Sequence, residues 1–212
     1  MINVANLNAA ARLALWEQWG AKGYLFKNSS VSSSDLSTVQ NIFVKTSARG
    51  TTYSCRLLPE TFTIDKLNLN GAQGYAYRGQ IIIATVAHTI YVKDNGSDAI
   101  FDYALKDSKS TIEGLLKQMN DMGAQGYGLQ GEVSSNSTIN TFYVRSSANP
   151  APFTYATAPV VNSSAQAAVN ELNTKAANGE VYWGDWSDGA TTVSIYYKGG
   201  LIMHPLVGPV FP

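Results

Sequence analysis

Aromatic and acidic side chains crowd one short stretch, Val181-Tyr-Trp-Gly-Asp-Trp-Ser-Asp-Gly189. In a strand, alternation would place Tyr182 with Trp186 on one face and Trp183 with Asp185 on the other. Exposed rings beside carboxylates suit stacking on a sugar ring, with hydrogen bonds to the acids. The opposing interpretation, a tryptophan in the core and a plain turn at Asp188, is favoured because aromatic rings act mostly through burial. The candidate binding patch comprises Tyr182, Trp183, Asp185, Trp186 and Asp188.

A basic residue ends the corresponding predicted strand in each quarter of the chain. Four positive charges brought together would form a ring facing an anionic ligand. A charge at a strand end also keeps sheet edges soluble, and this interpretation is favoured because such edge residues are common. The possible anion ring comprises Lys45, Lys93, Arg145 and Lys198.

Nucleophilic catalysis would need Cys55 with His88 or His204. All three lie on predicted strands, and a lone cysteine in a strand is usually a small core residue. The two histidines are far apart and show no metal-ligand spacing. We therefore expect no metal, no cofactor and no catalytic residues, and keep an enzyme using Cys55 and His88 at a repeat interface as the alternative.

The composition narrows the function classes. The chain has 212 residues, of which 45% are hydrophobic and only 14% charged, and its formal net charge is zero. Nucleic-acid binders usually carry a basic excess, so none is expected as partner. The single cysteine allows no internal disulfide, and no apolar run predicts a membrane span or a signal peptide at the N-terminus. A composition rich in Ser, Thr, Asn and Gly is common in secreted, surface and virion proteins.

One short motif recurs four times and sets the organisation of the chain. Gly20-Ala-Lys-Gly23-Tyr24 is repeated as Gly71-Ala-Gln-Gly74-Tyr75 and Gly123-Ala-Gln-Gly126-Tyr127, with a divergent copy ending at Gly179. The second glycines lie at positions 23, 74, 126 and 179, so the steps are 51, 52 and 53 residues. A fixed period of this size indicates tandem repeats.

Each copy of the motif predicts a corner between a helix and a strand. The first glycine follows an apolar periodic run, where a residue just past a helix end needs positive φ. The second glycine allows a sharp turn, and the aromatic residue after it opens the strand. The motif therefore predicts four corners with the same backbone geometry.

Helices are predicted at about 8–19, 64–70, 112–122 and 165–177, each preceding strands. Asn6 or Asn8 can cap the first helix, while Ser110 with Glu113 and Ser163 with Gln166 predict capping boxes. Three strands follow each helix, and Asn95-Gly96 marks a tight hairpin. The last of these strands is expected at residues 201–204.

These elements predict an α+β fold of four α-β-β-β repeats, with antiparallel sheets each covered by one helix, in one pseudo-symmetric body. The predicted repeats span residues 1–59, 60–107, 108–158 and 159–212. One repeat is too small to bury a core, so neighbours must stack. A ring closed by the last strand and a pair of two-repeat layers remain alternatives.

The pattern of helix, Gly-Ala-x-Gly-aromatic corner, and strand ending in Val44-Lys45 or Val92-Lys93 resembles a family of small uncharacterised bacterial domains. The resemblance covers all four repeats, although tyrosine replaces the family's tryptophan in three copies. It implies a strand–helix–strand–strand order and no known activity. We expect a non-catalytic binding or assembly protein with an unknown protein or glycan partner, and a homo-oligomer is a further expectation.

Overall fold

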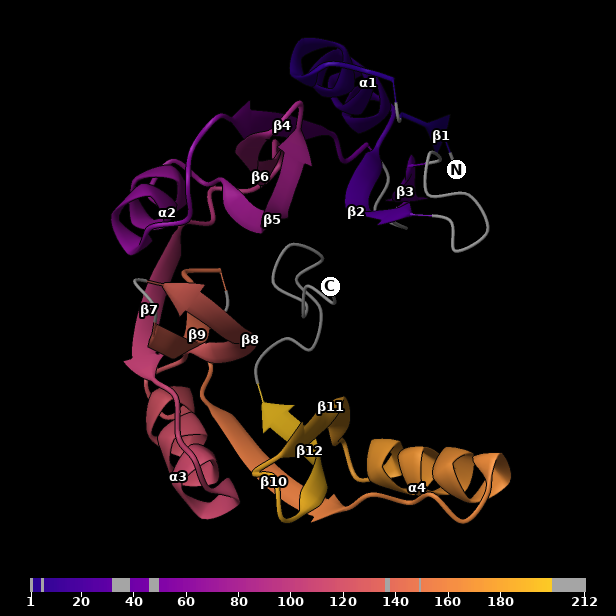
Figure 1. Cartoon of the computed structure of the whole chain (residues 1–212), viewed down its shortest axis with the longest axis vertical. Helices are drawn as coiled ribbons and strands as arrows, with labels where there is room; N and C mark the ends of the chain where they lie inside the picture. Colours follow the sequence, from indigo (N-terminus) through magenta and orange to yellow (C-terminus); the bar gives the residue numbers. More distant parts are fainter. Residues whose placement is uncertain are drawn as a thin grey trace. The chain divides into compact units, whose positions relative to one another are not determined.

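A computed structural model of the chain describes residues 2–4, 6–31, 39–45, 50–135, 138–148 and 150–199. It divides into two compact units, the first extending to Tyr103 and the second beginning at Ala104. The helices and strands follow one another along the chain in a regular order (Figure 1). In chain order they are β1 (Ile2–Asn3), α1 (Ala9–Ala21), β2 (Tyr24–Val31), β3 (Val39–Lys45), β4 (Tyr53–Leu58), α2 (Ile64–Gly71), β5 (Ala76–Ile83), β6 (Val86–Asp94), β7 (Phe101–Asp107), α3 (Ile112–Gly123), β8 (Gly128–Ser135), β9 (Thr138–Ser146), β10 (Phe153–Pro159), α4 (Ala165–Ala177), β11 (Val181–Ser187) and β12 (Thr192–Gly199).

The strands form four sheets of three strands, and all four have the same order. Sheet A is β1-β3-β2, sheet B is β4-β6-β5, sheet C is β7-β9-β8, and sheet D is β10-β12-β11. One helix accompanies each sheet, so the predicted α+β fold of four repeats is confirmed. The last predicted strand, at 201–204, lies outside the described residues.

Hydrogen bonding assigns the strand before each helix to the sheet that follows it. Tyr53–Leu58 pairs with β6 of sheet B, although the predicted first repeat extends to residue 59. Each repeat, defined by its sheet, therefore has the chain order strand, helix, strand, strand. Sequence patterns locate a strand but do not say which neighbour it pairs with, because pairing is a long-range choice.

The second glycine of each motif has the expected left-handed backbone. The φ angles of Gly23, Gly74, Gly126 and Gly179 are 82°, 83°, 81° and 74°. Residues with a Cβ rarely adopt this backbone conformation, so glycine is the residue that permits the corner. The four corners thus bend the chain in the same way.

The first glycine serves a different purpose from the one predicted. Gly20, Gly71 and Gly123 lie within helices and do not have positive φ. A Cβ added there would lie 2.1, 2.2 and 2.3 Å from the backbone oxygens of Tyr53, Phe101 and Phe153, respectively. These aromatic residues begin β4, β7 and β10, so each glycine lets a helix approach the first strand of the next sheet.

The N-cap of α1 is one of the predicted residues, whereas those of α3 and α4 differ from the prediction by one residue. Asn8 caps α1 through a 2.9 Å bond from the Ala11 N–H, as expected. The caps of α3 and α4 are Thr111 and Ser164, each one residue after the predicted serine. Both sites hold two adjacent hydroxyl residues, and only the local backbone decides which one reaches the free N–H groups.

A β-bulge interrupts the hairpin of every repeat, and the sequence analysis did not anticipate it. The register shifts between Phe26 and Asn28, Tyr77 and Gly79, Leu129 and Gly131, and Tyr182 and Gly184. In the second and third repeats an N–H at the bulge is bound by a tyrosine hydroxyl from the first strand of the next sheet. The backbone N–H of Tyr77 donates to the Tyr103 hydroxyl of β7, and that of Leu129 donates to the Tyr155 hydroxyl of β10, both at 2.7 Å.

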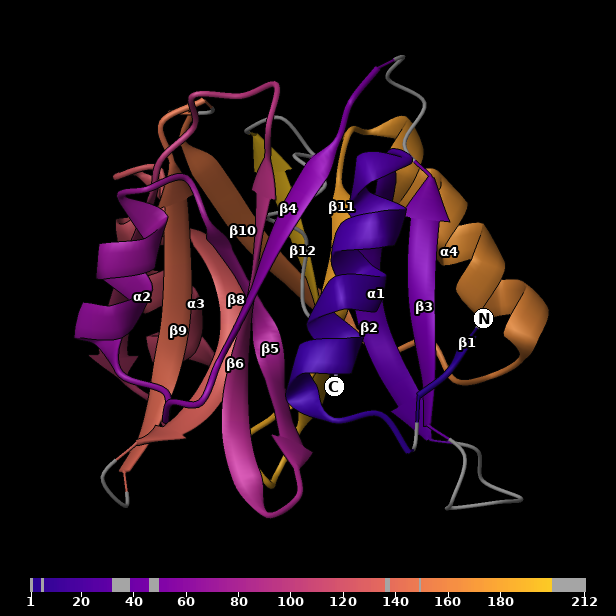
Figure 2. The ribbon, with the colours of Figure 1, turned by 90° about the horizontal axis from the view of Figure 1, so that it is seen from above.

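In the first unit, α1 contacts both its own sheet and the next one. Figure 2 shows α1 alongside β2 and β4. Trp16 stacks on Phe26 of sheet A with ring centroids 4.5 Å apart, while Gly20 meets Tyr53 of sheet B. In the second unit, Leu115, Met119 and Met122 of α3 form a core with Tyr143 of sheet C and Ile195 of sheet D. A helix between two sheets is thus the repeated packing unit.

Candidate interaction surface

A polar clamp on the helix accompanies the close approach at each internal junction. The Asn120 amide group donates to the Tyr155 carbonyl (3.1 Å) and accepts from the Tyr155 N–H (2.8 Å). Asn68 makes the same pair of bonds to Tyr103, at 3.2 and 2.7 Å. In α1, Glu17 accepts from the Cys55 N–H at 2.6 Å. These clamps satisfy backbone groups on the outer side of an edge strand, which the sheet itself leaves open.

Helix α4 keeps the asparagine of this clamp, but no strand within the described residues is bonded to it. The residue three positions before the first glycine is Asn68 in α2 and Asn120 in α3, and it is Asn173 in α4. Asn173 is exposed. The glycine position itself holds Ala176, which is exposed. An exposed position has room for a Cβ, unlike the positions of Gly20, Gly71 and Gly123.

The burial of one helix position separates α4 from the other three helices. Trp16, Leu67 and Met119 are 0%, 1% and 0% exposed, whereas the corresponding Leu172 is 40% exposed. Val169, one turn earlier, is also exposed, and α4 has no buried residue. These side chains recur at helical spacing on one side of α4. The outer face of α4 comprises Val169, Leu172, Asn173 and Ala176.

Sheet A has a first strand that is too short to pair along the whole of β3. β1 pairs with β3 only at Asn41 and Gln40, whereas all six residues of β4 pair with β6. Among the described residues, no strand pairs with the β1-side edge of β3 from Ile42 to Lys45. Val44 is 45% exposed, while its counterparts Val92 and Val144 are 0% and 3% exposed. The open edge of β3 therefore comprises residues 42–45.

The two tryptophans of the predicted patch belong to the core rather than to an exposed surface. The bulge at Trp183 turns it to the same side as Trp186, so the predicted alternation of faces is wrong. Both rings are half-buried against the core of the second unit. The Trp183 indole donates to the Leu129 carbonyl at 3.1 Å.

The remaining patch residues have local partners. The exposed Tyr182 packs edge-on to Tyr196, and burial together with the Asp185 carboxylate raises the pKa of Tyr182 to about 12. Asp185 also accepts a 2.7 Å bond from Ser194. Asp188 holds the turn through bonds from the Thr191 and Ala190 N–H groups, which lower the pKa of its carboxyl. The five patch residues therefore have separate roles: two pack against the core, two contact neighbours in the sheet, and one holds the turn.

Three residues of the possible anion ring stack on the corner tyrosine of their own repeat. The Lys45 and Lys93 ammonium groups lie 5.5 and 5.8 Å from the rings of Tyr24 and Tyr75. The Arg145 guanidinium lies 4.8 Å from the Tyr127 ring. In the fourth repeat Glu180 replaces the tyrosine, and Lys198 is exposed. The recurring charge is thus matched by a cation–π partner wherever the tyrosine is present.

Cys55 and His88 do not come together. Cys55 lies opposite Val92, and His88 is four residues from Val92 on β6, about 13 Å along the strand. Burial, reinforced by the Glu17 carboxylate, raises the pKa of the Cys55 thiol to about 12. The His88 Nδ1 lies 2.9 Å from the Val86 carbonyl oxygen. His204 lies outside the described residues.

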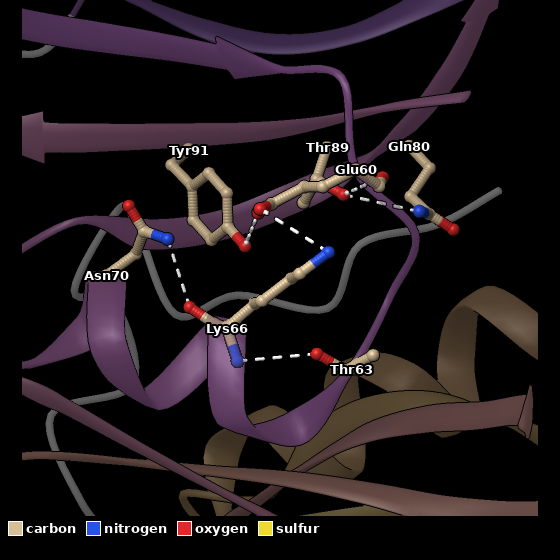
Figure 3. A network of polar contacts seen from close by, with 7 residues as sticks. All are labelled: Glu60, Thr63, Lys66, Asn70, Gln80, Thr89 and Tyr91. Carbon is tan, nitrogen blue, oxygen red and sulfur yellow. Dashed lines mark hydrogen bonds and ion pairs between the residues drawn. The ribbon is translucent and has the colours of Figure 1, made fainter. Parts of the chain in front are cut away.

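A polar network in the first unit fixes the loop before α2 to sheet B (Figure 3). The Tyr91 hydroxyl donates to the Glu60 carboxylate at 2.8 Å, and Lys66 lies 3.8 Å from the same group. Thr89 donates to the Glu60 carbonyl at 3.0 Å. Tyr91 is fully buried, which raises the pKa of its hydroxyl and keeps that hydroxyl from any substrate. The network therefore stabilises the fold.

Within the described part of the chain, no group of three or more His, Cys, Asp or Glu side chains could hold a metal ion. No helix in that part is long and apolar enough to cross a membrane.

Comparisons with family models, curated proteins and solved structures found no match to this chain.

Sequence reasoning missed the outer face of α4, although the signal was present. The four helices, aligned on their corner glycines, have Trp16, Leu67, Met119 and Leu172 at one position. Only the fourth copy replaces the glycine with alanine, and Ala176 is exposed. The exposure of Leu172 is informative only because the structure shows that Trp16, Leu67 and Met119 are buried.

Proposed function

We propose that this protein is a non-catalytic assembly protein that self-associates through its first and fourth repeats. The observation that carries the proposal is the exposure of Leu172 at a helix position that is buried in the other three repeats. In repeat proteins each repeat contacts its neighbours, so an exposed apolar face on one repeat is a contact surface without its neighbour. Val169 and Leu172 give the outer face of α4 this character.

The two surfaces differ in kind, which favours a head-to-tail arrangement. The fourth repeat offers a helix face and the first repeat a sheet with an open edge, and each described junction joins a helix to the next sheet. A contact between unlike surfaces generates rings or filaments rather than a two-fold dimer. Three observations support a non-catalytic role. The Cys55 side chain is buried, the Tyr91 hydroxyl is bound to Glu60, and three of the four recurring basic residues stack on tyrosine rings. A secreted, surface or virion location remains a prediction.

The test is self-association of the full chain measured by sedimentation velocity over a range of protein concentrations. Leu172→Asp should raise the dissociation constant at least tenfold, because it places a charge in the contact. Leu69→Asp is the matched control, since Leu69 is also an exposed leucine on a helix. Both variants should keep the wild-type circular dichroism spectrum.

A wild-type chain that stays monomeric at every concentration would refute the proposal. A photo-cross-linking residue at position 172, with position 69 as control, locates the contact, and adducts between copies are expected at position 172 only.

A further inference from the structure

A groove along α3, within the second unit, gathers three lysines. We propose that this lysine groove binds a small molecule that carries phosphate groups. The groove encloses about 440 Å³, which is within the roughly 300–1,000 Å³ of small-molecule sites. The residues that carry the argument are Lys106, Lys109, Lys117, Gln118, Asp121 and Met122. The inference goes beyond the proposed assembly and does not depend on it.

One face of α3 forms the first wall of the lysine groove. Lys117, Gln118, Asp121 and Met122 follow one another at helical spacing, so their side chains share this face. Met122 is only 4% exposed, whereas Lys117 and Asp121 are exposed. The wall therefore has an apolar base with charged groups above it, which suits the organic part of a ligand as well as its charge.

The connection from β7 into α3 forms the second wall (Figure 1). Lys106 lies next to the end of β7 and Lys109 follows it in the connection, and both side chains are exposed. Gly114 also lines the groove, and a Cβ added there would lie 3.5 Å from the Lys109 Cβ. The absence of a side chain at Gly114 therefore leaves room beside Lys109.

Hydrogen bonds hold the connection in place before any ligand binds. The Gln118 side chain donates to the Asp107 carbonyl at 2.9 Å and accepts from the Tyr143 hydroxyl at 3.1 Å. The Ser108 N–H donates to the Ile139 carbonyl at 3.3 Å. The backbone that carries the first two lysines is thus fixed to α3 and to sheet C. A ligand would order only the ends of the lysine side chains, which lowers the entropic cost of binding.

The charge of the lining residues is positive. Three lysines and one carboxylate give a net charge of +2, because 3 − 1 = 2. The carboxylate of Asp121 pairs with Lys117 at 2.6 Å. Among the described residues, Lys106 and Lys109 form no ion pair with a carboxylate. Their ammonium groups can therefore bind an anion without first giving up a partner.

The other acidic residues near the groove do not line it. Asp107 and Glu113 are exposed, and Glu132 binds the Ser108 hydroxyl. The Ile112 N–H helps to lower the pKa of the Asp188 carboxyl, so the first N–H of α3 already serves a carboxylate. The attraction for an anion thus comes from the lysines rather than from the helix N-terminus.

Phosphate is the anion that this chemistry fits. A lysine ammonium is a compact charge with three N–H donors, and it binds phosphate oxygens as a point charge. A second groove, of about 290 Å³, offers a contrast, because it contains one lysine, Lys93, and one acid, Asp98. Lys93 already donates to the Gln73 carbonyl at 3.0 Å. The concentration of three lysines therefore distinguishes the lysine groove.

Calorimetric titration of the full chain with sodium pyrophosphate at low ionic strength tests the proposal. The wild type should show saturable binding to one site. Lys106→Gln with Lys109→Gln should raise the Kd about tenfold or more, because charge-assisted hydrogen bonds are lost. Lys22→Gln with Lys45→Gln is the matched control, since it removes the same charge from two exposed lysines of the first unit. The control should stay within about twofold of the wild type, as for distant exposed charges in salt.

A change of opposite sign provides a second test. Asp121→Asn should lower the Kd about twofold or more, because it removes the one carboxylate among the described lining residues and releases Lys117. A merely structural role for Asp121 would not tighten binding. Circular dichroism should show the same fold for all of these variants.

Vesicles distinguish a free ligand from a lipid headgroup. Phosphatidylcholine vesicles containing a phosphoinositide should sediment with the chain if the phosphate belongs to a lipid, and the Lys106 and Lys109 changes should abolish this. Binding of pyrophosphate alone, with the same dependence, supports a free ligand. A wild-type chain that binds neither probe would overturn the inference, as would a control pair that weakens binding as much as the groove pair. Leu172→Asp should bind pyrophosphate like the wild type, which keeps this result separate from the assembly proposal.

Discussion

Asn120 binds both backbone groups of Tyr155, with its amide N–H₂ 3.1 Å from the carbonyl oxygen and its carbonyl oxygen 2.8 Å from the N–H. One side chain thus does what a neighbouring strand would do on the outer side of β10. The same relationship between Asn68 and Tyr103 makes it a property of the repeat. It also gives a matched comparison, because Asn173 lies at the same position of α4 and is exposed.

Asn120→Ala should lower the free energy of unfolding by about 2–3 kcal/mol, because two backbone groups of a buried residue lose their partner. Asn173→Ala should change it by less than about 0.5 kcal/mol, as for other exposed surface sites. Urea unfolding followed by circular dichroism measures both at a concentration where the chain is monomeric. Equal effects at the two positions would contradict the assignment of Asn120 as a clamp.

Gly123→Ala should destabilise the protein by about 2–3 kcal/mol, because its Cβ would lie 2.3 Å from the Phe153 oxygen and force the helix away from β10. The reverse change, Ala176→Gly, should cost no more than about 1 kcal/mol, the difference in helix propensity. Thermal unfolding midpoints of the two variants provide the comparison. A Gly123→Ala chain as stable as the wild type would show that the approach is not tight.

The Cys55 thiol should react slowly with Ellman's reagent at pH 8. Its pKa is raised to about 12 by burial and by Glu17, so the thiolate is scarce as well as inaccessible. Because the folded pKa lies above the ordinary value, the stabilising contribution is present below about pH 9 and is lost as the pH rises toward 12. Complete reaction of the thiol within seconds in the native chain would contradict this and revive a nucleophilic role.

Alkaline pH should destabilise the fold through the buried tyrosines. Burial raises the pKa of Tyr77 to about 12, and it also raises the pKa values of Tyr91, Tyr103, Tyr143 and Tyr155. An acid with a raised folded pKa stabilises the native state below about pH 10 and ceases to do so as the pH rises through the folded value. Tyrosinate absorbance should therefore appear in two steps in the native chain and in one step near pH 10 in urea. A single native step near pH 10 would contradict the burial of these hydroxyls.

Much of the local structure could be predicted from the sequence. The range of α4, Ala165–Ala177, and the cap at Asn8 follow from apolar periodicity and from the preference of short polar side chains for helix starts. The left-handed backbone at Gly74 follows from the motif alone. These features depend on residues close together in the chain, which is why the pattern contains them.

Tertiary structure decided everything that depends on which segments meet. Gly123 looks like a helix-ending residue until Phe153 is seen beside it, and Trp183 looks like an exposed aromatic until the bulge turns it toward Leu129. Leu172 looks like a core residue, and only the absence of a described strand beside it makes it a surface. The sequence by itself determined four copies of one helix-to-strand corner, together with the helix and the strand on either side of it. The folded chain decided the pairing of each edge strand, because hydrogen bonds and close contacts between distant segments leave no short-range pattern.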